Sequence, residues 1–253
     1  MELSVIIPAY NEEARLGWML DQYLPFFNEQ YAGCYEILVV VNGSRDRTED
    51  IVREYARVHK PVRVIVDPRP IGKGGAVMLG FTQAQGRLVG FVDADGATPP
   101  EAFQALVEHI GVAGAIIASR WMPGARVSPR QPLGRRLASR LFNVLVRLMF
   151  GMRISDTQCG AKLLTREAVQ AILPHIGITQ WAFDVDLLFQ LRRAGFDIVE
   201  IPTSWHDVSG SRLRVGKASA EMLAAMVRLR LIYSPFRWVV SLYDRTLARY
   251  MQN

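Results

Sequence analysis

The residues best suited to chemistry are two aspartates, Asp93 and Asp95, which directly follow a short apolar segment at residues 88–92. A short apolar run of this kind is typical of a buried strand, and open α/β sheets bind ligands at the carboxyl ends of their strands. Two carboxylates so close together repel each other unless a cation lies beside them. Oxygen ligands suit Mg²⁺ or Mn²⁺, and Mg²⁺ commonly combines one or two carboxylates with substrate phosphates. The pair therefore predicts a metal–diphosphate site, with an ordinary turn at Asp95-Gly96 as the alternative.

Polar side chains also occur just beyond the three earlier apolar segments, at residues 4–8, 36–41 and 62–66. In chain order they are Tyr10, Glu12, Asn42, Asp46 and Lys73. Because the carboxyl ends of parallel strands meet at one edge of a sheet, we expect these side chains to share one site with the aspartate pair. This arrangement is the one that a nucleotide pocket needs.

The glycine-rich stretch around Lys73, residues 72–75, is not a P-loop, because Asp67 stands where the first glycine is needed and Gly74 where Ser or Thr is needed. We interpret it as a flexible turn before a helix at residues 76–83, which lets Lys73 reach a phosphate or a base. A plain turn is the alternative.

A second acidic pair, Asp184 and Asp186, falls near the start of a predicted helix at residues 183–194. Positions i and i+2 lie on different helix faces, so we expect one carboxylate to point into the cleft and the other to face solvent. The alternative is that both acids merely stabilise the helix dipole.

The net charge of +6 is unevenly distributed, since residues 120–153 carry many arginines and no acidic residue. Such a block indicates a phosphate-rich partner, either a nucleotide, a nucleic acid or an anionic membrane, unless it is only a solvated basic face. The chain has neither zinc-finger spacing nor an RNP-like aromatic motif, which argues against nucleic acid.

These groups must be positioned by strands that alternate with helices, a pattern that predicts an α/β fold with a mostly parallel central sheet flanked by helices. The predicted strands cover residues 4–8, 36–41, 62–66, 88–92, 113–119 and 198–201. The predicted helices begin near Leu16 and continue at residues 48–59, 76–83, 101–109, 133–150, 166–175, 183–194, 217–233 and 236–251. With two cysteines, no signal-peptide pattern and no long uncharged apolar stretch, we expect a cytoplasmic protein, soluble or peripheral on a membrane.

Taken together, the motifs resemble those of family 2 inverting glycosyltransferases with the glycosyltransferase A fold. They are, in order, Val5–Glu12, Asn42–Ser44, Gly72–Gly74 and Asp93–Asp95. Further along, Asp156–Lys162 is similar to the signature of polyprenol-phosphate hexosyltransferases, which include the dolichyl-phosphate mannose synthases and β-glucosyltransferases. Residues 181–186 and 210–213 look closer to the glucosyltransferase branch. The resemblance covers roughly residues 3–215.

The resemblance implies roles for individual residues. The donor nucleotide sugar would be held by Pro8, Ala9, Tyr10, Glu12, Asn42, Lys73, Asp93, Ala94, Asp95 and Arg120, with Asp93 and Asp95 as metal ligands. The sugar and acceptor side would contain Asp156, Gln158, Lys162, Arg136 and Arg212. Asn42 stands where the family usually has Asp, which alters the charge available to a base.

The implied reaction moves a hexose, with inversion, from a nucleotide diphosphate sugar of the UDP-glucose or GDP-mannose type to a polyprenyl phosphate, with Mg²⁺ or Mn²⁺ as cofactor. A phosphate monoester is largely dianionic at neutral pH and needs no strong base. A hydroxyl acceptor would need one. Besides Asp95, which faces the diphosphate, the candidate catalytic residues are therefore Asp156 and Asp184.

Three alternatives remain at this point. The first is a soluble family 2 enzyme acting on a sugar, polysaccharide or small-molecule hydroxyl. The second is a sugar-1-phosphate nucleotidyltransferase, which would need a glycine-rich basic loop after the first strand. The third is a non-catalytic membrane adaptor, which the intact Asp93 and Asp95 oppose.

The expected domain organisation is a catalytic domain at residues 1–215 followed by basic amphipathic helices at residues 216–253. Together with the arginine-rich helix at residues 133–150, these helices suit an anionic membrane surface. Packing on the core, or a contact in a homo-oligomer, is the alternative.

Overall fold

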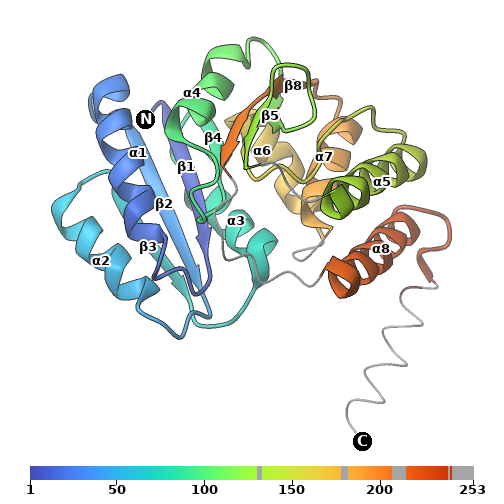
Figure 1. The fold of residues 1–253 in the computed structure, drawn as a ribbon, viewed down its shortest axis with the longest axis horizontal. Coiled ribbons are helices and arrows are strands. Elements are labelled where there is room, and N and C mark those ends of the chain that lie inside the picture. The colour runs from blue at the N-terminus through green and yellow to red at the C-terminus, as the bar shows by residue number, and fades with distance from the viewer. Residues whose placement is uncertain (130–132, 178–181, 207–214, 239, 241–253) are drawn as a thin grey trace, which may run out of the picture.

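The computed structural model describes residues 1–129, 133–177, 182–206, 215–238 and 240, and in them strands and helices alternate as predicted (Figure 1). The strands are β1 Leu3–Ala9, β2 Tyr35–Asn42, β3 Val62–Asp67, β4 Leu88–Phe91, β5 Ala115–Ser119, β6 Arg126–Ser128, β7 Lys162–Thr165, β8 Ile198–Pro202 and β9 Ser204–His206. The helices are α1 Leu16–Tyr31, α2 Thr48–Val58, α3 Gly72–Gln83, α4 Pro100–His109, α5 Leu133–Phe150, α6 Arg166–Ile172, the 3₁₀ helix η1 Leu173–His175, α7 Phe183–Arg193 and α8 Val215–Ile232.

The central sheet has the strand order β3-β2-β1-β4-β7-β5-β8. Every neighbouring pair is parallel except the two that involve β7, which runs antiparallel between β4 and β5. The parallel strands therefore end at one edge, where Asn42 lies opposite Asp67 and the loop after β4 follows Phe91. The predicted α/β architecture with a mostly parallel sheet is confirmed.

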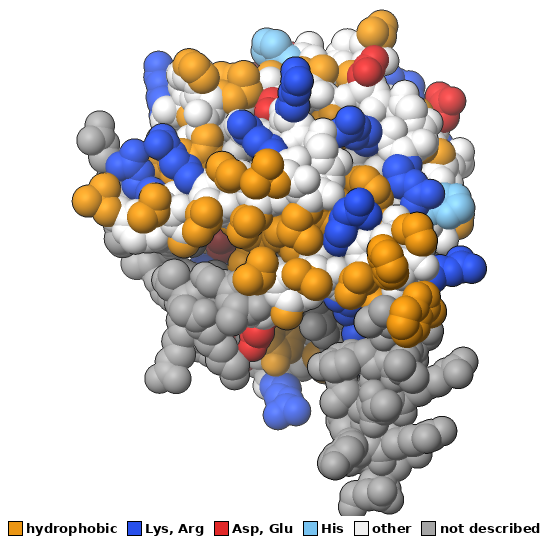
Figure 2. Space-filling model, turned by 90° about the vertical axis from the view of Figure 1, so that its right-hand side faces the viewer, with side chains coloured by type: hydrophobic (Ala, Val, Ile, Leu, Met, Phe, Trp, Pro, Cys, Tyr) orange, Lys and Arg blue, Asp and Glu red, His pale blue; other side chains and the backbone are white. Residues whose placement is uncertain are grey.

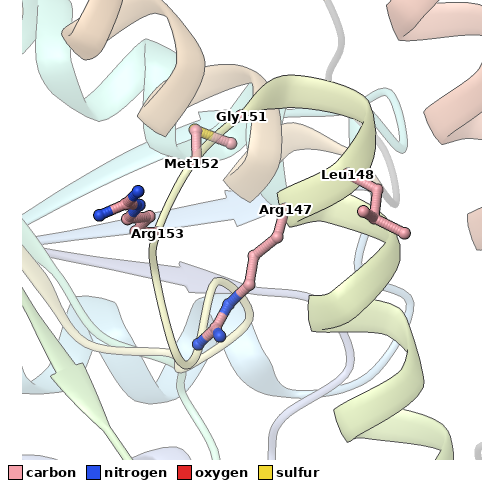
Figure 3. A pocket seen from close by; sticks show the side chains of 5 residues that line it. All are labelled: Arg147, Leu148, Gly151, Met152 and Arg153. Atoms are coloured by element: carbon pink, nitrogen blue, oxygen red, sulfur yellow. The ribbon is translucent and has the colours of Figure 1, made fainter.

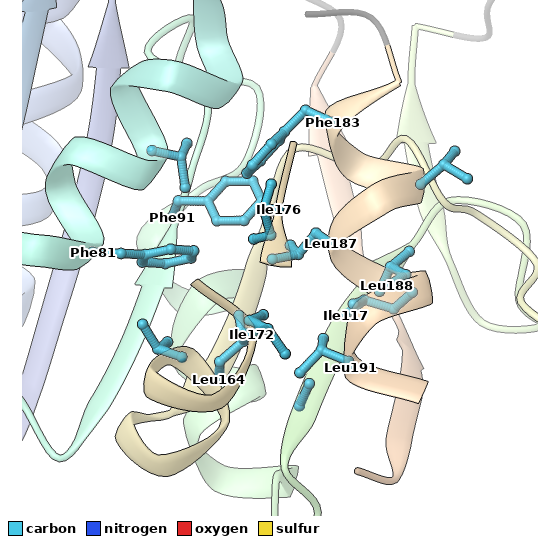
Figure 4. Packing of buried hydrophobic residues seen from close by; sticks show 14 of the residues in the cluster. Phe81, Phe91, Ile117, Leu164, Ile172, Ile176, Phe183, Leu187, Leu188 and Leu191 are labelled. Carbon is cyan, nitrogen blue, oxygen red and sulfur yellow. The ribbon is translucent and has the colours of Figure 1, made fainter. Parts of the chain in front are cut away.

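Helices cover both faces of the sheet, which explains why its strands are almost continuously apolar. Along β1, Ile6 packs into the core beneath α3 and α7, whereas Val5 and Ile7 pack into the core beneath α1 and α4. Figure 4 shows the first of these cores, in which Phe91 of β4 lies between Phe81 and Phe183. Burying a phenylalanine side chain of this kind stabilises the fold by about 1.5–3 kcal/mol.

Three details differ from the sequence expectations. Residues 72–75 are the first turn of α3 and not a flexible turn before it, because buried Gly74 and Gly80 let the helix pack closely on the sheet. A Cβ on Gly80 would stand 2.5 Å from Ile6. The helix expected at residues 166–175 becomes a 3₁₀ turn from Leu173 onward, where Pro174 follows. The short strands β6, β7 and β9 were not predicted. The helix expected at residues 236–251 lies almost entirely outside the described residues and stays a prediction.

Helices α5 and α8 pack against each other at the end of the molecule opposite α1 and α2 (Figure 1). Met226 and Leu229 anchor α8 in the core beneath α7. Tyr233, just beyond α8, donates to the Asp186 carboxylate at 2.8 Å. Among the described helices, none is long and apolar enough to cross a membrane.

Candidate active site

The loops after β1 and β2 are joined at the carboxyl edge of the sheet by hydrogen bonds from backbone amides to side chains. The amide of Asn11 donates to Ser44 at 3.1 Å, and that of Glu12 donates to Thr48 at 2.8 Å. Asn42 donates through Nδ2 to the carbonyl of Ala9 at 3.1 Å. Its Oδ1 is buried and has no hydrogen-bond partner among the described residues. Asn42 thus offers a free acceptor at this edge.

The predicted donor residues of the first loop lie beside this acceptor. Ala9 is fully buried, Pro8 is half-buried and Tyr10 is exposed. Glu12 forms an ion pair with Arg15 at 2.6 Å. The sequence prediction that Tyr10, Glu12 and Asn42 share one edge of the sheet is confirmed.

Asp93 and Asp95 occupy the loop after β4, with buried Ala94 between them. Asp95 accepts a hydrogen bond from the amide of Ala97 at 3.0 Å. Burial raises the pKa of Asp95, and the negative charge of Asp93 raises it further. Burial also raises the pKa of Glu12, to which the charges of Asp95 and Asp93 add. These carboxylates therefore lie close enough to repel one another, which favours a cation between them.

The oxygen ligands in this loop fit a divalent metal whose coordination sphere is completed by oxygens of the substrate. All side-chain donors of Asp93 and Asp95 are carboxylate oxygens, which suits Mg²⁺ or Mn²⁺. Within the described ranges, no group of three or more His, Cys, Asp or Glu side chains is placed to hold a metal without help. Two carboxylates plus substrate phosphates is a common Mg²⁺ arrangement, so the pair fits a metal that binds with its nucleotide.

Two glycines set the position of this loop. A Cβ on Gly160 would lie 2.1 Å from Oδ2 of Asp93, so only glycine lets the loop before β7 approach that carboxylate. Gly96 has φ +71°, a backbone conformation that favours glycine, and its Cα faces the ring of Trp18. The aspartate loop is therefore held between α1 and the loop that precedes β7.

Two lysines and two aspartates form a charge cluster beside Phe91, which we call the lysine cluster: Lys73, Lys162, Asp93 and Asp184. Lys73 Nζ lies 2.7 Å from Asp93 Oδ1 and 3.5 Å from Asp184 Oδ2. Lys162 is fully buried and donates to Asp184 Oδ1 at 2.6 Å and to the Cys159 carbonyl at 2.7 Å. Burial alone raises the pKa of Asp184, but Lys162 and Lys73 outweigh it and lower that pKa.

The second acid of α7 does not face solvent, contrary to expectation. Asp186 is fully buried and accepts hydrogen bonds from the amide of Gly177 at 3.0 Å and from Tyr233. The prediction that Asp184 and Asp186 point in different directions holds, because one joins the lysine cluster and the other binds the segment that follows α8.

Asp156 is fully buried and bound by Arg120, which follows β5. The Arg120 guanidinium donates to both carboxylate oxygens, at 2.8 and 3.0 Å, and the Arg120 amide donates at 3.0 Å. Burial alone raises the pKa of Asp156, but Arg120 outweighs it and lowers that pKa. Arg120 also lies over the ring of Trp205 at 5.4 Å.

The other residues expected on the acceptor side are only partly assembled. Gln158 is half-buried, and its Nε2 has no partner in the described part of the chain. Arg136 lies in the first turn of α5. Arg212 falls outside the described residues.

Sequence reasoning missed two supports of this site. Glu200 of β8 accepts hydrogen bonds from the amide and the hydroxyl of Ser155, at 2.8 Å each, and so holds the segment that carries Asp156. Trp121, whose buried Nε1 has no partner among the described residues, stacks under Arg140 of α5 at 5.2 Å. A lone glutamate in a strand and a tryptophan in a loop gave no spacing signal by which either could have been found.

The comparisons with known proteins agree with this geometry. The family model for glycosyl transferase family 2 matches residues 4–173. The dolichyl-phosphate beta-glucosyltransferase of Drosophila melanogaster is 37% identical over 84% of this chain and 69% of its own length. Those of Saccharomyces cerevisiae and Dictyostelium discoideum are 34% and 33% identical, over 91% and 94% of this chain and 75% and 76% of their own lengths.

Among solved structures, the glucosyl-3-phosphoglycerate synthase of Mycobacterium tuberculosis in complex with UDP superposes with a TM-score of 0.68 at 20% identity. The match covers 92% of this chain and 82% of that chain, and it supports the expected glycosyltransferase A fold. On the family match and on relatives that align over most of their own length, the chain belongs to the family 2 glycosyltransferases.

Proposed function

We propose that this protein transfers glucose from a UDP-glucose-type nucleotide diphosphate sugar to a polyprenyl phosphate of the dolichyl type, with inversion at the anomeric carbon. The names of the relatives support both the sugar and the acceptor. The choice of acceptor rests on one observation: Asp156 and Asp184, the two carboxylates considered as a general base, are both ion-paired.

Neither Asp156 nor Asp184 is free to accept a proton. Asp156 is bound by Arg120 through both oxygens, and Asp184 is bound by Lys162 and Lys73. The pKa of each is lowered, and a carboxylate with a lowered pKa is a weaker base. The acceptor should therefore arrive already ionised. A phosphate monoester, with a second pKa of about 6, meets that requirement at neutral pH.

The chemistry then divides among the residues as follows. An acceptor phosphate oxygen forms a bond to the anomeric carbon as the bond from that carbon to the diphosphate breaks, and the electron pair leaves with the nucleoside diphosphate. Asp93 and Asp95 would hold a divalent metal, which supplies Lewis-acid stabilisation of the leaving diphosphate. Lys73 and Arg120 supply fixed positive charge, and Asn42 Oδ1 supplies an acceptor for a base N–H. Asp156 and Asp184 act as positioning residues for these cations.

A matched pair of acceptors tests this proposal. The protein is incubated with UDP-glucose and Mn²⁺ or Mg²⁺, with either polyprenyl phosphate or the corresponding polyprenol. We expect transfer to the phosphate and none to the alcohol, and UDP-GlcNAc and GDP-mannose should be poor donors. Equal transfer to the polyprenol or to a sugar hydroxyl would contradict the proposal, because that reaction needs a free base.

We also propose that α5 and α8 bring the protein to the anionic membrane surface that holds its acceptor, on the cytoplasmic side. The exposed apolar residues of these helices form one surface, the α5/α8 face: Leu133, Leu137, Leu141, Val144, Leu148, Leu223 and Val227. Figure 2 shows hydrophobic side chains gathered at this end of the molecule, with Lys and Arg side chains around them. Basic residues near an anionic leaflet contribute about 1 kcal/mol each.

A pocket of about 560 Å³ opens at the end of α5 and has the same mixed character. It is lined by Arg147, Leu148, Gly151, Met152 and Arg153 (Figure 3). In Figure 3, Arg147 and Leu148 leave α5 in different directions, and Arg153 lies on the segment that follows the helix. The exposed Leu148 side chain next to these arginines suits a lipid chain beside a phosphate headgroup.

Vesicle flotation tests the membrane proposal. Leu137, Leu141 and Leu148 are exchanged together for glutamine, and the control exchanges Val58 and Val112, which are at least as exposed and lie outside α5 and α8. We expect the wild type and the control to float with phosphatidylserine vesicles and the triple variant to remain below. If all three behave alike, the α5/α8 face does not bind membrane. A change in oligomeric state of the triple variant alone would favour a homo-oligomer contact. The same proposal includes the division of the chain into a catalytic part, residues 1–215, and a part that contacts the membrane, residues 216–253.

A further inference from the structure

Lys73 is bound to the very carboxylate that the proposed function assigns to the metal. Its Nζ lies 2.7 Å from Asp93 Oδ1, a distance typical of a strong charge-assisted hydrogen bond, and 3.5 Å from Asp184 Oδ2. A cation on Asp93 and the ammonium of Lys73 would both require the same oxygen atoms and would repel each other.

We propose that Lys73 is an exchangeable counter-ion, which neutralises Asp93 in the free enzyme and turns to the donor diphosphate when Asp93 binds a divalent cation. It would thereby make metal binding weak without nucleotide and strong with it. This inference rests on the proposed donor site, which it deepens by assigning a second role to Lys73.

The two contacts of Lys73 differ in how easily they can be given up. The side chains of Lys73 and Asp93 are 32% and 39% exposed, so water screens their attraction. The Asp184 side chain is only 7% exposed, so its attraction for Lys73 is less screened. Breaking the contact with Asp93 is therefore the cheaper change, and Asp184 keeps the ammonium at the site.

Asp184 is itself held firmly. Its other oxygen accepts a hydrogen bond from Lys162, whose ammonium is fully buried and also donates to the Cys159 carbonyl. Phe91 lies under both lysines, with Nζ atoms 5.5 and 5.4 Å from the ring centroid. Lys162 and Asp184 thus keep their positions, and the Lys73 ammonium can stay near Asp184 while it moves from Asp93 to a bound ligand.

The charges of the site also favour joint binding of metal and nucleotide. The lysine cluster contains two positive and two negative side chains, and Asp95, the second proposed metal ligand, adds one negative charge, so the free site carries a net charge of about −1. A divalent cation changes this net charge to about +1, and a diphosphate with one negative charge on each phosphate returns it to about −1. Metal and nucleotide should therefore bind cooperatively, because each removes the electrostatic cost of the other.

The test is the exchange Lys73→Met, with Lys60→Met as the matched control at an exposed lysine. Mn²⁺ binding without nucleotide is followed by the electron paramagnetic resonance signal of the free ion, and UDP binding at saturating Mn²⁺ by calorimetry. We expect Lys73→Met to tighten Mn²⁺ binding about fivefold, the change that a half-exposed ion pair of ~1 kcal/mol gives. The same variant should bind UDP at least about fivefold more weakly. Thermal melting reports whether each variant is folded.

Opposite shifts in the two affinities support the exchange, since a merely structural lysine would weaken both. Mn²⁺ affinity that is unchanged or weaker in Lys73→Met would overturn it, as would equal tightening in Lys60→Met, which would reveal a general charge effect. A wild type that binds neither Mn²⁺ nor UDP would overturn the proposed function itself. A wild type that binds both and transfers glucose, with no tightening in Lys73→Met, would overturn only this inference.

Discussion

The exchange Asp156→Asn separates the role derived from the structure from the role that the sequence suggested. As a general base, Asp156 would be essential for turnover and dispensable for folding. As the partner of Arg120, it is required for the fold of the site. We expect Asp156→Asn to destabilise the protein, because the amide has one acceptor oxygen in place of two and its NH2 group would face a donor of the Arg120 guanidinium.

The magnitude follows from burial and geometry. Asp156 is fully buried, the Arg120 side chain is 14% exposed, and three hydrogen bonds of 2.8–3.0 Å join the two residues. Removing one partner of a buried ion pair costs about 3–5 kcal/mol, since it leaves the other charge unpaired. Asparagine retains one acceptor oxygen, so we place the loss at the lower end, about 3 kcal/mol in the free energy of unfolding.

The pH dependence of this loss has a definite sign. Because the folded-state pKa of Asp156 is lowered, its contribution to stability is fully present above the unfolded-state pKa of about 3.9 and is lost as the pH falls through the folded value. The stability difference between wild type and Asp156→Asn should therefore be constant from about pH 5 to 8 and shrink below about pH 4.

Urea unfolding of the wild type, Asp156→Asn, Arg120→Met and the double variant measures these quantities. We expect the double variant to lose less than the sum of the two single losses, because neither charge is then left buried alone. The reasoning is refuted if Asp156→Asn unfolds within about 1 kcal/mol of the wild type and yet loses its activity. That result would identify Asp156 as a general base and would favour a hydroxyl acceptor.

Three further predictions concern the metal site and the cysteines. Gly160→Ala should lower the rate of transfer by about 100-fold while thermal melting shows a folded protein, since the added Cβ, 2.1 Å from an oxygen of Asp93, displaces that carboxylate; unaltered kinetics would contradict the close approach. Removal of divalent metal with EDTA should abolish transfer, and Mn²⁺ or Mg²⁺ should restore it; full activity in EDTA would refute the metal assignment. Iodoacetamide at pH 8 should label exposed Cys34 but not Cys159, because burial raises the pKa of Cys159 to about 11, and mass spectrometry of native and unfolded samples would show any exception.

Much of the fold could be predicted because the signals that encode it are local. The alternation of apolar strands with amphipathic helices placed the first four strands within one or two residues of their observed bounds. It failed at β7. Strand β4 is just as short, but it carries no charged residue, whereas β7 begins with Lys162, ends with Thr165 and has only two apolar residues between them. Two apolar residues do not mark a strand in the sequence, and β7 forms because it pairs with β4 on one side and β5 on the other.

The donor half of the site was also accessible from sequence, since Tyr10, Glu12, Asn42 and the aspartate pair each follow a parallel strand and must meet at one edge. Their individual roles toward a nucleotide sugar stay predictions. The acceptor half was less accessible, because it depends on segments that are remote in sequence and joined by β7. In register with Phe91, Lys162 places the segment from Asp156 to Gly160 beside the aspartate loop.

The sequence by itself determined which chemistry is present: oxygen ligands for a metal, cations for phosphates, and carboxylates at the ends of strands and helices. It could not decide what each carboxylate does, because the behaviour of a carboxylate depends on burial and on partners that the fold supplies. Asp95 is partly buried among negative charges, and its pKa is raised. Asp156 and Asp184 are buried against cations, and the pKa of each is lowered. Only the tertiary structure brings Arg120 and Lys162 to these acids, so that two candidate bases become the ion-pair partners that position cations.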